Sequence, residues 1–401
     1  MSPQNLTGAL HQEAGQLHEE IRRLRRHLHQ HPELSFHEHV TTRYLKEYLE
    51  QEGFAPQPVP TETGTMIVLG DADTAHPTLA LRADIDALPI LEENETDYRS
   101  ENEGVMHACG HDVHTSTMLG AAHLLRKFQD QWKGQIKIIF QPAEEKSPGG
   151  AKPMIEGGIL KNPEVKAAFG QHVAPDIPAG KVGFRPGLYM ASTDEVYITV
   201  KGKGGHAAMP DRLVDPVVIA AQLITQLQSL VSRNAPPTVP TVLSFGFVEA
   251  KGSNNVIPNE VRLAGTLRTF DEGWREEARR RIQLISESMA TGMGAKAEVD
   301  IQSGYPALHN HEALTRECEK WAREYLPEED VLQLDMRPTG EDFAYFGKAL
   351  PSTFYRLGTR KGGDIMRNLH TPHFDIDEEV LPLGAGMMAH LAIRYMQENA
   401  G

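Results

Sequence analysis

The amino-acid sequence predicts an α/β fold: a mostly parallel sheet in one domain, with a smaller α+β domain inserted into it. The chain has 401 residues and is too long for a single typical hydrophobic core, so two domains are expected. Strand-like and helix-like segments alternate up to about residue 188 and again after residue 304, a pattern typical of α/β domains. Between these parts the order is strand, helix, strand, strand, helix, strand, as in a ferredoxin-like domain. We therefore predict one domain of residues 1–188 and 304–401 and an inserted domain of residues 189–303.

The first domain begins with a helical pattern. Apolar residues spaced three or four apart, such as Leu17, Ile21, Leu24 and Leu28, predict helix from about Ala9 to Glu52. Short apolar runs then predict strands at residues 65–69, 78–83, 135–140 and 165–170. Helices are expected at residues 114–132 and 151–156. Strands that alternate with helices pair in parallel, so we expect a largely parallel sheet.

The inserted domain is predicted from a change in this rhythm. Residues 195–201 alternate between apolar and polar, which is typical of a half-exposed strand. Further strands are expected at residues 241–248, 260–268 and 296–302, and helices at residues 215–233 and 272–293. The first pattern then resumes, with a helix at residues 312–324 and a strand at residues 352–357.

Composition excludes several classes of function. The net charge of −15 argues against a nucleic acid or an anionic membrane as partner, because both require a basic surface. No apolar run approaches the ~20 residues needed to span a bilayer, and the first residues lack the pattern of a secretory signal. Cys109 and Cys318 give no disulfide framework, so we expect a cytoplasmic protein.

Polar clusters follow the predicted core strands of the first domain. They contain thiol, imidazole and carboxylate groups, at Asp84, Asp86, Cys109, His111, Glu144, Glu145, His172 and His370. In open α/β sheets, ligands bind at the carboxyl ends of the strands, so these clusters are expected to converge. Such groups bind divalent Zn, Mn, Co or Ni. An adjacent carboxylate pair, Glu144 and Glu145, could provide one metal ligand and one free base.

Eight motifs, in order, resemble those of a known family. They are ADIDALP, HACGHDVHT, QPAEE, GQHV, GKGGHAAMP, NVIPNEV, GEDFAYF and NLHTPHFD. This set is similar to the dinuclear metallo-amidohydrolases, which include aminoacylases, hippurate hydrolases and indole-acetyl-amino-acid hydrolases. The resemblance covers the chain from His29 to its last helix. It implies a zinc-peptidase-like catalytic domain, interrupted by a ferredoxin-like lid domain through which the protein forms a homodimer or a higher oligomer.

The resemblance also implies the activity and the residues of the site. We expect hydrolysis of the amide bond of N-acyl amino acids with two divalent ions per subunit; an N-acetyl-diaminopimelate deacetylase, a carboxypeptidase or a dipeptidase remains open. The implied metal ligands are Cys109, His111, Glu145, His172 and His370. Glu144 is the implied general base, and Asp86 supports a metal ligand from behind. In the inserted domain, His206 is expected to reach the partner's site and polarise the scissile carbonyl, while Asn255 and Arg268 contact substrate.

Other histidines are interpreted as structural. The tract HLHQHPELSFHEH is rich in histidine, but we expect it only to join a helix to the catalytic domain. His107 and His114 are expected to support the site, and His373 is a weaker ligand candidate than His370. Relatives commonly have a histidine where this chain has Asp211, which leaves the local shape of the lid open.

Two other classes of function are considered. A cysteine hydrolase would use Cys109 as nucleophile, with His111 or His114 as base, but a base two residues away along the chain is poorly placed. A binding or scaffold protein would have kept the fold and lost turnover. The intact set of Glu144, His206 and five candidate ligands argues against that reading.

Overall fold

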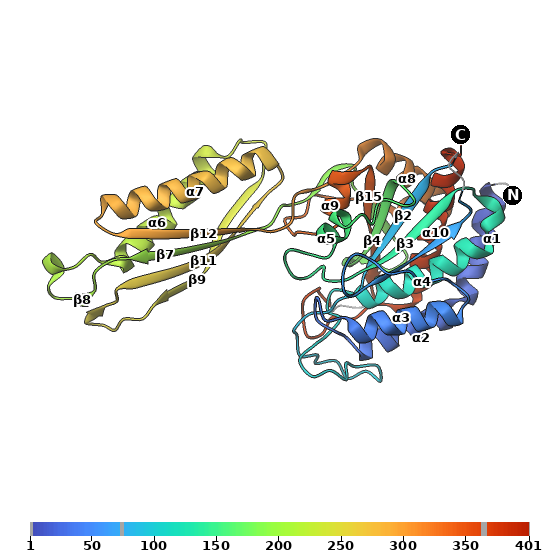
Figure 1. Cartoon of the computed structure of the whole chain (residues 1–401), viewed down its shortest axis with the longest axis horizontal. Helices are drawn as coiled ribbons and strands as arrows, with labels where there is room; N and C mark the ends of the chain where they lie inside the picture. Colours follow the sequence, from blue (N-terminus) through green and yellow to red (C-terminus); the bar gives the residue numbers. More distant parts are fainter. Residues whose placement is uncertain (1–2, 73–75, 362–366, 401) are drawn as a thin grey trace. The chain divides into compact units, whose positions relative to one another are not determined.

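The computed structural model describes residues 3–72, 76–361 and 367–400, which fold as two compact units (Figure 1). The first unit comprises Met1–Gly187, His309–Asp335 and Asp342–Gly401, and the second comprises Leu188–Leu308 and Met336–Glu341. The short stretch Met336–Glu341 was assigned to the other domain from sequence. It packs with the second unit because Arg337 exchanges backbone hydrogen bonds with Tyr189 and Ala191.

The first unit contains a seven-stranded mixed sheet with the order β1-β3-β2-β4-β15-β5-β14. Its strands are β1 (Thr65–Gly70), β2 (Thr78–Asp84), β3 (Gln135–Gln141), β4 (Val165–Pro178), β5 (Val182–Phe184), β14 (Val331–Gln333) and β15 (Ser352–Arg360). The four neighbours β3, β2, β4 and β15 are parallel, whereas β1 runs antiparallel to β3 and β5 antiparallel to β15. The predicted fold class is confirmed.

The carboxyl ends of the parallel strands determine where the polar clusters lie. Asp84 ends β2 directly beside Gln141, which ends β3. β4 is longer than predicted, but it pairs with β2 only as far as Gly170. His172 therefore lies just beyond that pairing, next to Arg356 of β15.

Helices cover this sheet. They are α1 (Pro3–Gln16), α2 (His18–Gln30), α3 (His39–Gln51), α4 (His111–Lys127), α5 (Ala151–Glu156), α8 (Glu312–Tyr325), α9 (Ala344–Ala349) and α10 (Leu381–Glu398). α4 is buried on almost all sides and packs against α2, α10 and β2. A Cβ atom at Gly120 would come within 2.6 Å of Ile21 and 2.9 Å of Ala385, so the packing is close. This burial fixes the first residue of α4, His111, beside the sheet.

The helical pattern predicted from about Ala9 to Glu52 is interrupted in the structure. The chain forms three helices there, and the segment between His31 and Glu38 is not helical. Pro32 explains the break, because a residue before proline is disfavoured in the helical conformation and proline has no amide proton to donate.

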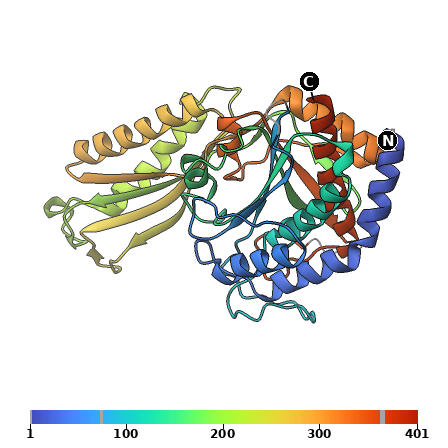
Figure 2. The ribbon, with the colours of Figure 1, turned by 45° about the vertical axis from the view of Figure 1, so that its right-hand side comes forward.

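The second unit has the predicted strand and helix order. Its main elements are β7 (Asp194–Lys201), α6 (Pro216–Ser229), β9 (Thr241–Ala250), β11 (Glu260–Thr269), α7 (Glu272–Gly292) and β12 (Lys296–Ser303). The antiparallel sheet has the order β12-β7-β11-β9, and both helices cover one of its faces (Figures 1 and 2). Alternate residues of β7, namely Val196, Ile198 and Val200, are buried against them.

Short strands complete the structure. They are β6 (Gly187–Met190), β8 (Gly205–His206), β10 (Val256–Ile257) and β13 (Leu308–Asn310). Within the described residues, no helix combines the length and apolar character that a membrane span requires.

Candidate metal centre

The five predicted ligands lie together at the carboxyl edge of the first unit's sheet. Their ligand atoms form two groups, and within each group these atoms lie no more than 4.8 Å apart. One group is Cys109, His111 and His172, and the other is Cys109, Glu145 and His370. Cys109 belongs to both groups, so its sulfur could be shared by two cations.

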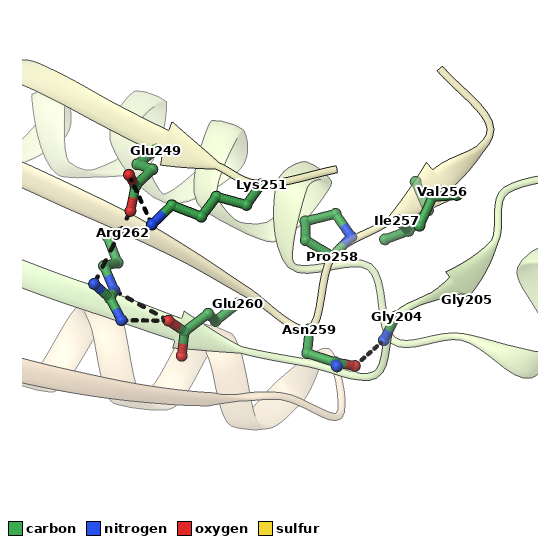
Figure 3. Close-up of a pocket in the computed structure, with 10 residues that line it drawn as sticks. All are labelled: Gly204, Gly205, Glu249, Lys251, Val256, Ile257, Pro258, Asn259, Glu260 and Arg262. Carbon is green, nitrogen blue, oxygen red and sulfur yellow. Dashed lines mark hydrogen bonds and ion pairs between the residues drawn. The ribbon is translucent and has the colours of Figure 1, made fainter. Parts of the chain in front are cut away.

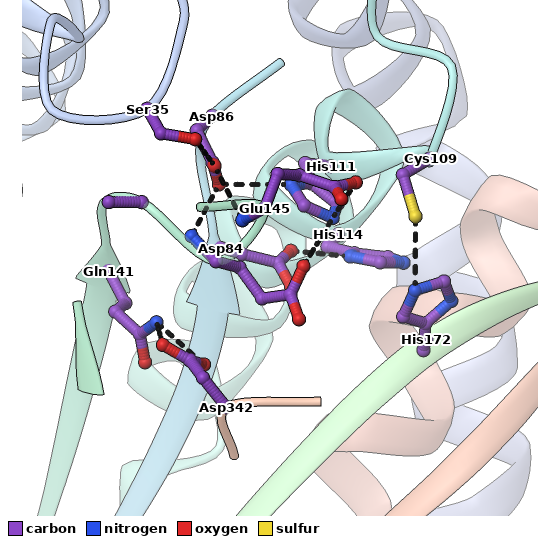
Figure 4. Close-up of polar contacts among 12 residues, drawn as sticks. Ser35, Asp84, Asp86, Cys109, His111, His114, Gln141, Glu145, His172 and Asp342 are labelled. Atoms are coloured by element: carbon purple, nitrogen blue, oxygen red, sulfur yellow. Dashed lines mark hydrogen bonds and ion pairs between the residues drawn. The ribbon is translucent and has the colours of Figure 1, made fainter. Parts of the chain in front are cut away.

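Figure 4 shows part of the site, with Cys109, His111, Glu145 and His172 among the side chains drawn. Cys109 Sγ lies 3.4 Å from His172 Nε2, and Glu145 Oε1 lies 3.4 Å from His370 Nε2. His111 Nε2 lies 3.8 Å from Glu145 Oε1 and 4.0 Å from Glu144 Oε2. Glu144 also forms a candidate group with His111 and Glu145.

Two unsatisfied buried atoms support a cation at this position. Within the described part of the chain, neither His111 Nε2 nor Glu145 Oε1 has a hydrogen-bond partner. His111 directs its other nitrogen, Nδ1, at Asp86 Oδ1 at 3.2 Å, and His172 Nδ1 donates to the carbonyl of Val173 at 2.8 Å. Hydrogen bonds of this kind hold a histidine with its second nitrogen free for metal.

The charge balance agrees with a cation. Burial alone would lower the pKa of His111, but the charges of Asp84, Asp86 and Glu145 raise it to about 10. Burial and the nearby charges of Glu145 and Glu144 raise the pKa of the Cys109 thiol well above its usual value. A divalent cation would offset this excess of negative charge and stabilise the thiolate. The residues therefore fit a metal centre.

Asp86 holds several parts of the site together. Its Oδ1 accepts from the amide of Glu144 at 3.0 Å as well as facing His111. Its Oδ2 accepts from the amide of Glu145 at 2.9 Å and from Ser35 Oγ at 2.6 Å. One buried carboxylate thus fixes both the imidazole of His111 and the backbone that carries the two glutamates.

A buried ion-pair network lies beneath the centre and was not predicted from sequence. Arg82 of β2 donates to Asp84 Oδ2 and Asp342 Oδ1, both at 2.6 Å, and to Gln141 Oε1 at 3.0 Å. Asp342 also accepts from the amide of Ala151 at 2.9 Å. Asp342 lies in the GEDFAYF motif, which marks it as a candidate functional residue. The sequence does not show that its partner is on β2.

His114 belongs to the same network and has no free nitrogen. Its Nδ1 donates to Asp84 Oδ1 at 2.5 Å, and its Nε2 accepts from the amide of Val173 at 2.9 Å. His114 is therefore unsuited to act as a base for Cys109, which argues against the cysteine-hydrolase alternative. It instead ties β2 to the residue that follows His172.

A second network fixes the first turn of α4 from the other side. Asp112 Oδ2 lies 2.8 Å from both Arg25 Nε and His29 Nδ1. Although burial opposes ionisation, Arg25 and His29 keep the pKa of Asp112 well below its usual range. His107 is also buried, and burial lowers its pKa to about 4. His29 therefore supports the N-terminus of α4. This role was not predicted from the HLHQHPELSFHEH tract in which His29 lies.

The segment with His370 forms the exposed side of the centre. His370 is 54% exposed in its side chain, has a positive φ of 58°, and donates its amide to the carbonyl of Ala108 at 2.8 Å. That bond joins the His370 segment to the turn that carries Cys109. His373 instead faces Glu93 at 3.2 Å and belongs to neither ligand group.

The second unit carries the remaining predicted residues. His206 lies on β8, opposite Val256 of β10, and Ala207 donates its amide to the carbonyl of Asn255 at 3.0 Å. Asp211 is exposed nearby. The adjoining pocket has a volume of about 460 Å³, and Asn259 anchors its wall by accepting from the amide of Gly204 at 2.9 Å (Figure 3).

Arg268 lies elsewhere in the second unit, near the opposite end of β11. It is only partly exposed, and burial lowers the pKa of its guanidinium, although the charges of Asp194 and Glu195 act in the opposite direction. A Cβ atom at Gly340 would lie 3.6 Å from its Nη1.

Comparison with known proteins gives a consistent result. The model of peptidase family M20/M25/M40 matches residues 80–394. N-acetyl-L-cysteine deacetylase of Bacillus subtilis (strain 168) is 40% identical over 94% of this chain and 88% of its own length. IAA-amino acid hydrolase ILR1-like 5 of Arabidopsis thaliana is 37% identical over 94% of this chain and 87% of its own. The Bacillus subtilis YXEP structure, described as a dinuclear metal binding peptidase, has a TM-score of 0.81 and 35% identity, covering 96% of this chain and 99% of that one.

Proposed function

The chain belongs to peptidase family M20/M25/M40 and is a hydrolase of that family, and on that premise we propose that it cleaves the amide bond of N-acyl amino acids. The names of two relatives describe an amino acid joined to an acyl group. The observation that carries the proposal is the position of Cys109 in both ligand groups. One thiolate between two sets of ligands suits a pair of divalent ions such as Zn, Mn, Co or Ni.

The residues around the centre divide the chemistry between them. Two divalent ions would polarise the scissile carbonyl and lower the pKa of the attacking water. Glu144 accepts a proton from that water at a carboxylate oxygen and later donates it to the nitrogen of the leaving amine. Asp86 keeps the backbone of Glu144 and Glu145 in place, so that the base and the ligand on adjacent residues do not exchange roles.

His206 is suited to stabilise the negative charge that develops on the carbonyl oxygen. The amide of Ala208 donates to His206 Nδ1 at 3.1 Å. In a neutral imidazole the proton is then on Nε2, which becomes a hydrogen-bond donor. A donor directed at the developing oxyanion lowers the barrier to acyl transfer. We assign this role to His206, and substrate contacts to Asn255 and Arg268.

The geometry of the second unit supports a shared site in a homodimer. His206 and Asn255 lie beyond the Glu260 end of β11, whereas Arg268 lies close to its other end. Arg268 lies eight residues further along the strand than Glu260, a distance of roughly 26 Å at about 3.3 Å per residue. A small N-acyl amino acid cannot contact both ends of one sheet. His206 and Asn255 of one subunit can serve a substrate together with Arg268 of the other.

An exposed sheet edge provides a surface for this dimer. β9 lies at the edge of its sheet, and its side chains Val242, Phe247 and Val248 are 41%, 50% and 56% exposed. Val217 and Val218 of α6 are also exposed. Unpaired strand edges with apolar side chains favour pairing with a second chain, and isologous pairing is the usual basis of a homodimer.

Mixing two inactive variants tests the shared site. We expect Glu144→Gln and His206→Ala to be inactive alone, and a mixture unfolded and refolded together to regain about a quarter of wild-type activity, since half of randomly assorted dimers contain one complete site. If His206 acted within its own subunit, no heterodimer would contain a complete site and the mixture would remain inactive. Sedimentation of an active wild-type monomer would also refute the proposal.

A substrate screen tests the function itself. N-acetyl, N-benzoyl and N-indoleacetyl amino acids, N-acetyl-diaminopimelate and unblocked dipeptides are each offered to protein loaded with Zn, Mn, Co or Ni. We expect hydrolysis of at least one N-acyl amino acid and loss of that activity after chelation. Turnover of dipeptides alone would favour the carboxypeptidase or dipeptidase alternative, and turnover of N-acetyl-diaminopimelate alone would favour a deacetylase. No turnover of any substrate would refute the proposal.

We also propose a cytoplasmic location for the enzyme. Cys109 and Cys318 are both free and buried. A metal-binding thiolate is protected from oxidation in a reducing compartment, which supports this assignment.

A further inference from the structure

Glu38 lies in the histidine-rich tract to which the mechanism above assigns no role. Its side chain is fully buried, 0% exposed. Its Oε1 accepts from the amides of Phe36 at 3.0 Å and Ala143 at 2.8 Å, and its Oε2 accepts from Thr63 Oγ1 at 2.7 Å. This carboxylate therefore joins three segments that are distant in sequence, and one of them is the loop that carries the glutamates of the site.

Ala143 is held in an unfavourable backbone conformation. It has a positive φ of 57°, which a residue with a Cβ atom rarely adopts. Its amide donates to Glu38 and its carbonyl accepts from the amide of Gly150 at 3.0 Å. A Cβ atom at Gly150 would lie 1.9 Å from the carbonyl oxygen of Pro142, so only glycine allows this approach. Such strained residues persist only where their surroundings fix them.

The contact from Glu38 continues the contacts made by Asp86. The amides of three successive residues, Ala143, Glu144 and Glu145, each donate to one of these two buried carboxylates. Ser35, three residues before Glu38, donates to Asp86. The tract from 35 to 38 therefore supports both carboxylates, and the loop has little freedom to change the direction of its side chains.

We propose that Glu38 is a positioning residue for Glu144: by holding the amide of Ala143, it keeps the strained turn that directs the Glu144 carboxylate at the reacting water. This inference rests on the proposed function, because it assumes that Glu144 is the base. A base must stay within hydrogen-bond reach of the proton it removes. The non-helical segment after Pro32 places Ser35 against Asp86 and Glu38 against Ala143.

The test compares Glu38→Ala with Glu38→Gln and with a matched control. Glu33 lies in the same tract, and its carboxylate accepts from the amides of Val40 at 3.1 Å and Thr41 at 2.7 Å, at the start of α3. Glu33→Ala therefore removes a carboxylate with similar bonds that does not touch the loop. Burial and the charge of Asp86 raise the pKa of Glu38 to about 7. All variants are therefore assayed with saturating metal at a pH above 7, where the Glu38 carboxylate is charged.

We expect Glu38→Ala to lower kcat about a hundredfold with little change in KM, because a displacement of the order of 1 Å has such an effect. It should retain its metal, and hydrogen exchange at the amides of 143–145 should accelerate. Glu38→Gln retains an acceptor for the Ala143 amide and should recover most of both properties. Glu33→Ala should lower the melting temperature and leave kcat and the exchange at 143–145 unchanged.

Several outcomes would overturn the inference. If hydrogen exchange at the amides of 143–145 is unchanged in Glu38→Ala, the inference is wrong, whatever the activity of that variant. It is also wrong if Glu33→Ala loses as much kcat as Glu38→Ala. If Glu38→Ala does not fold, Glu38→Asp is used, since its shorter side chain withdraws the carboxylate from the amide of Ala143; an unchanged kcat and exchange rate there would also contradict the role. An inactive wild type would refute the proposed function instead, while the exchange measurement still tests the contact.

Discussion

Replacing Glu144 with Gln is expected to abolish turnover while both metal ions remain bound. A glutamine is nearly the same size as glutamate but cannot take a proton from the attacking water. Loss of a general base costs about 10²–10⁴-fold in rate. The amide of residue 144 would still donate to Asp86, so the loop should keep its conformation. The variant is measured by kcat on the best substrate of the screen and by metal analysis of the purified protein.

Glu145→Gln is the matched control, because the two side chains are adjacent and both approach His111 Nε2. Glu145 Oε1 is also 3.4 Å from His370 Nε2, so its replacement should weaken one ion site and reduce the metal content. Activity of Glu144→Gln near that of the wild type would refute the assigned base. Loss of metal in Glu144→Gln but not in Glu145→Gln would reverse the two assignments.

Replacing Cys109 with Ala is expected to weaken the binding of both ions. Activity should be lost as a consequence. The sulfur is part of both ligand groups, whereas His172 and His370 each belong to one. His370→Ala should therefore lose one ion selectively and Cys109→Ala should lose both. Calorimetric titration of each metal-free variant with Zn or Mn gives the number of metal sites and their affinities.

Cys318→Ala provides the control for loss of a buried thiol. Cys318 lies on α8, is also fully buried, and belongs to none of the candidate metal groups in the described residues. It should bind two ions with unchanged affinity. If Cys109→Ala retained both ions, or if Cys318→Ala lost them, the shared-sulfur arrangement would be wrong.

The sequence predicted the core of the fold because its signals are local. Apolar runs such as those of β2 and β3, and the alternation in β7, depend only on neighbouring residues. The order of the elements in the second unit followed from the same signals. The break between α2 and α3 lies in the tract that was expected to join a helix to the catalytic domain, and Pro32 is the local signal for its position.

The candidate ligands could be proposed because each follows a strand that ends at one edge of the sheet. The residues that hold these ligands in place could not be proposed from sequence. Glu38, Arg82 and Asp342 act through contacts with residues far away in sequence, such as Glu38 with Ala143 and Arg82 with Asp342. Partners of this kind depend on tertiary packing. From sequence, the tract around Glu38 is expected only to join a helix to the catalytic domain, because histidine is its most visible feature. In the described residues, none of its histidines belongs to a candidate ligand group.

Anomalous X-ray diffraction from crystals grown with Mn or Zn tests most directly whether two cations share the Cys109 sulfur. Two peaks about 3.5–4 Å apart are expected, the usual spacing of paired catalytic ions, with Cys109 Sγ next to both. His111 and His172 should flank one peak, and Glu145 and His370 the other. A single peak, or peaks that leave Cys109 without a metal neighbour, would contradict the proposed chemistry.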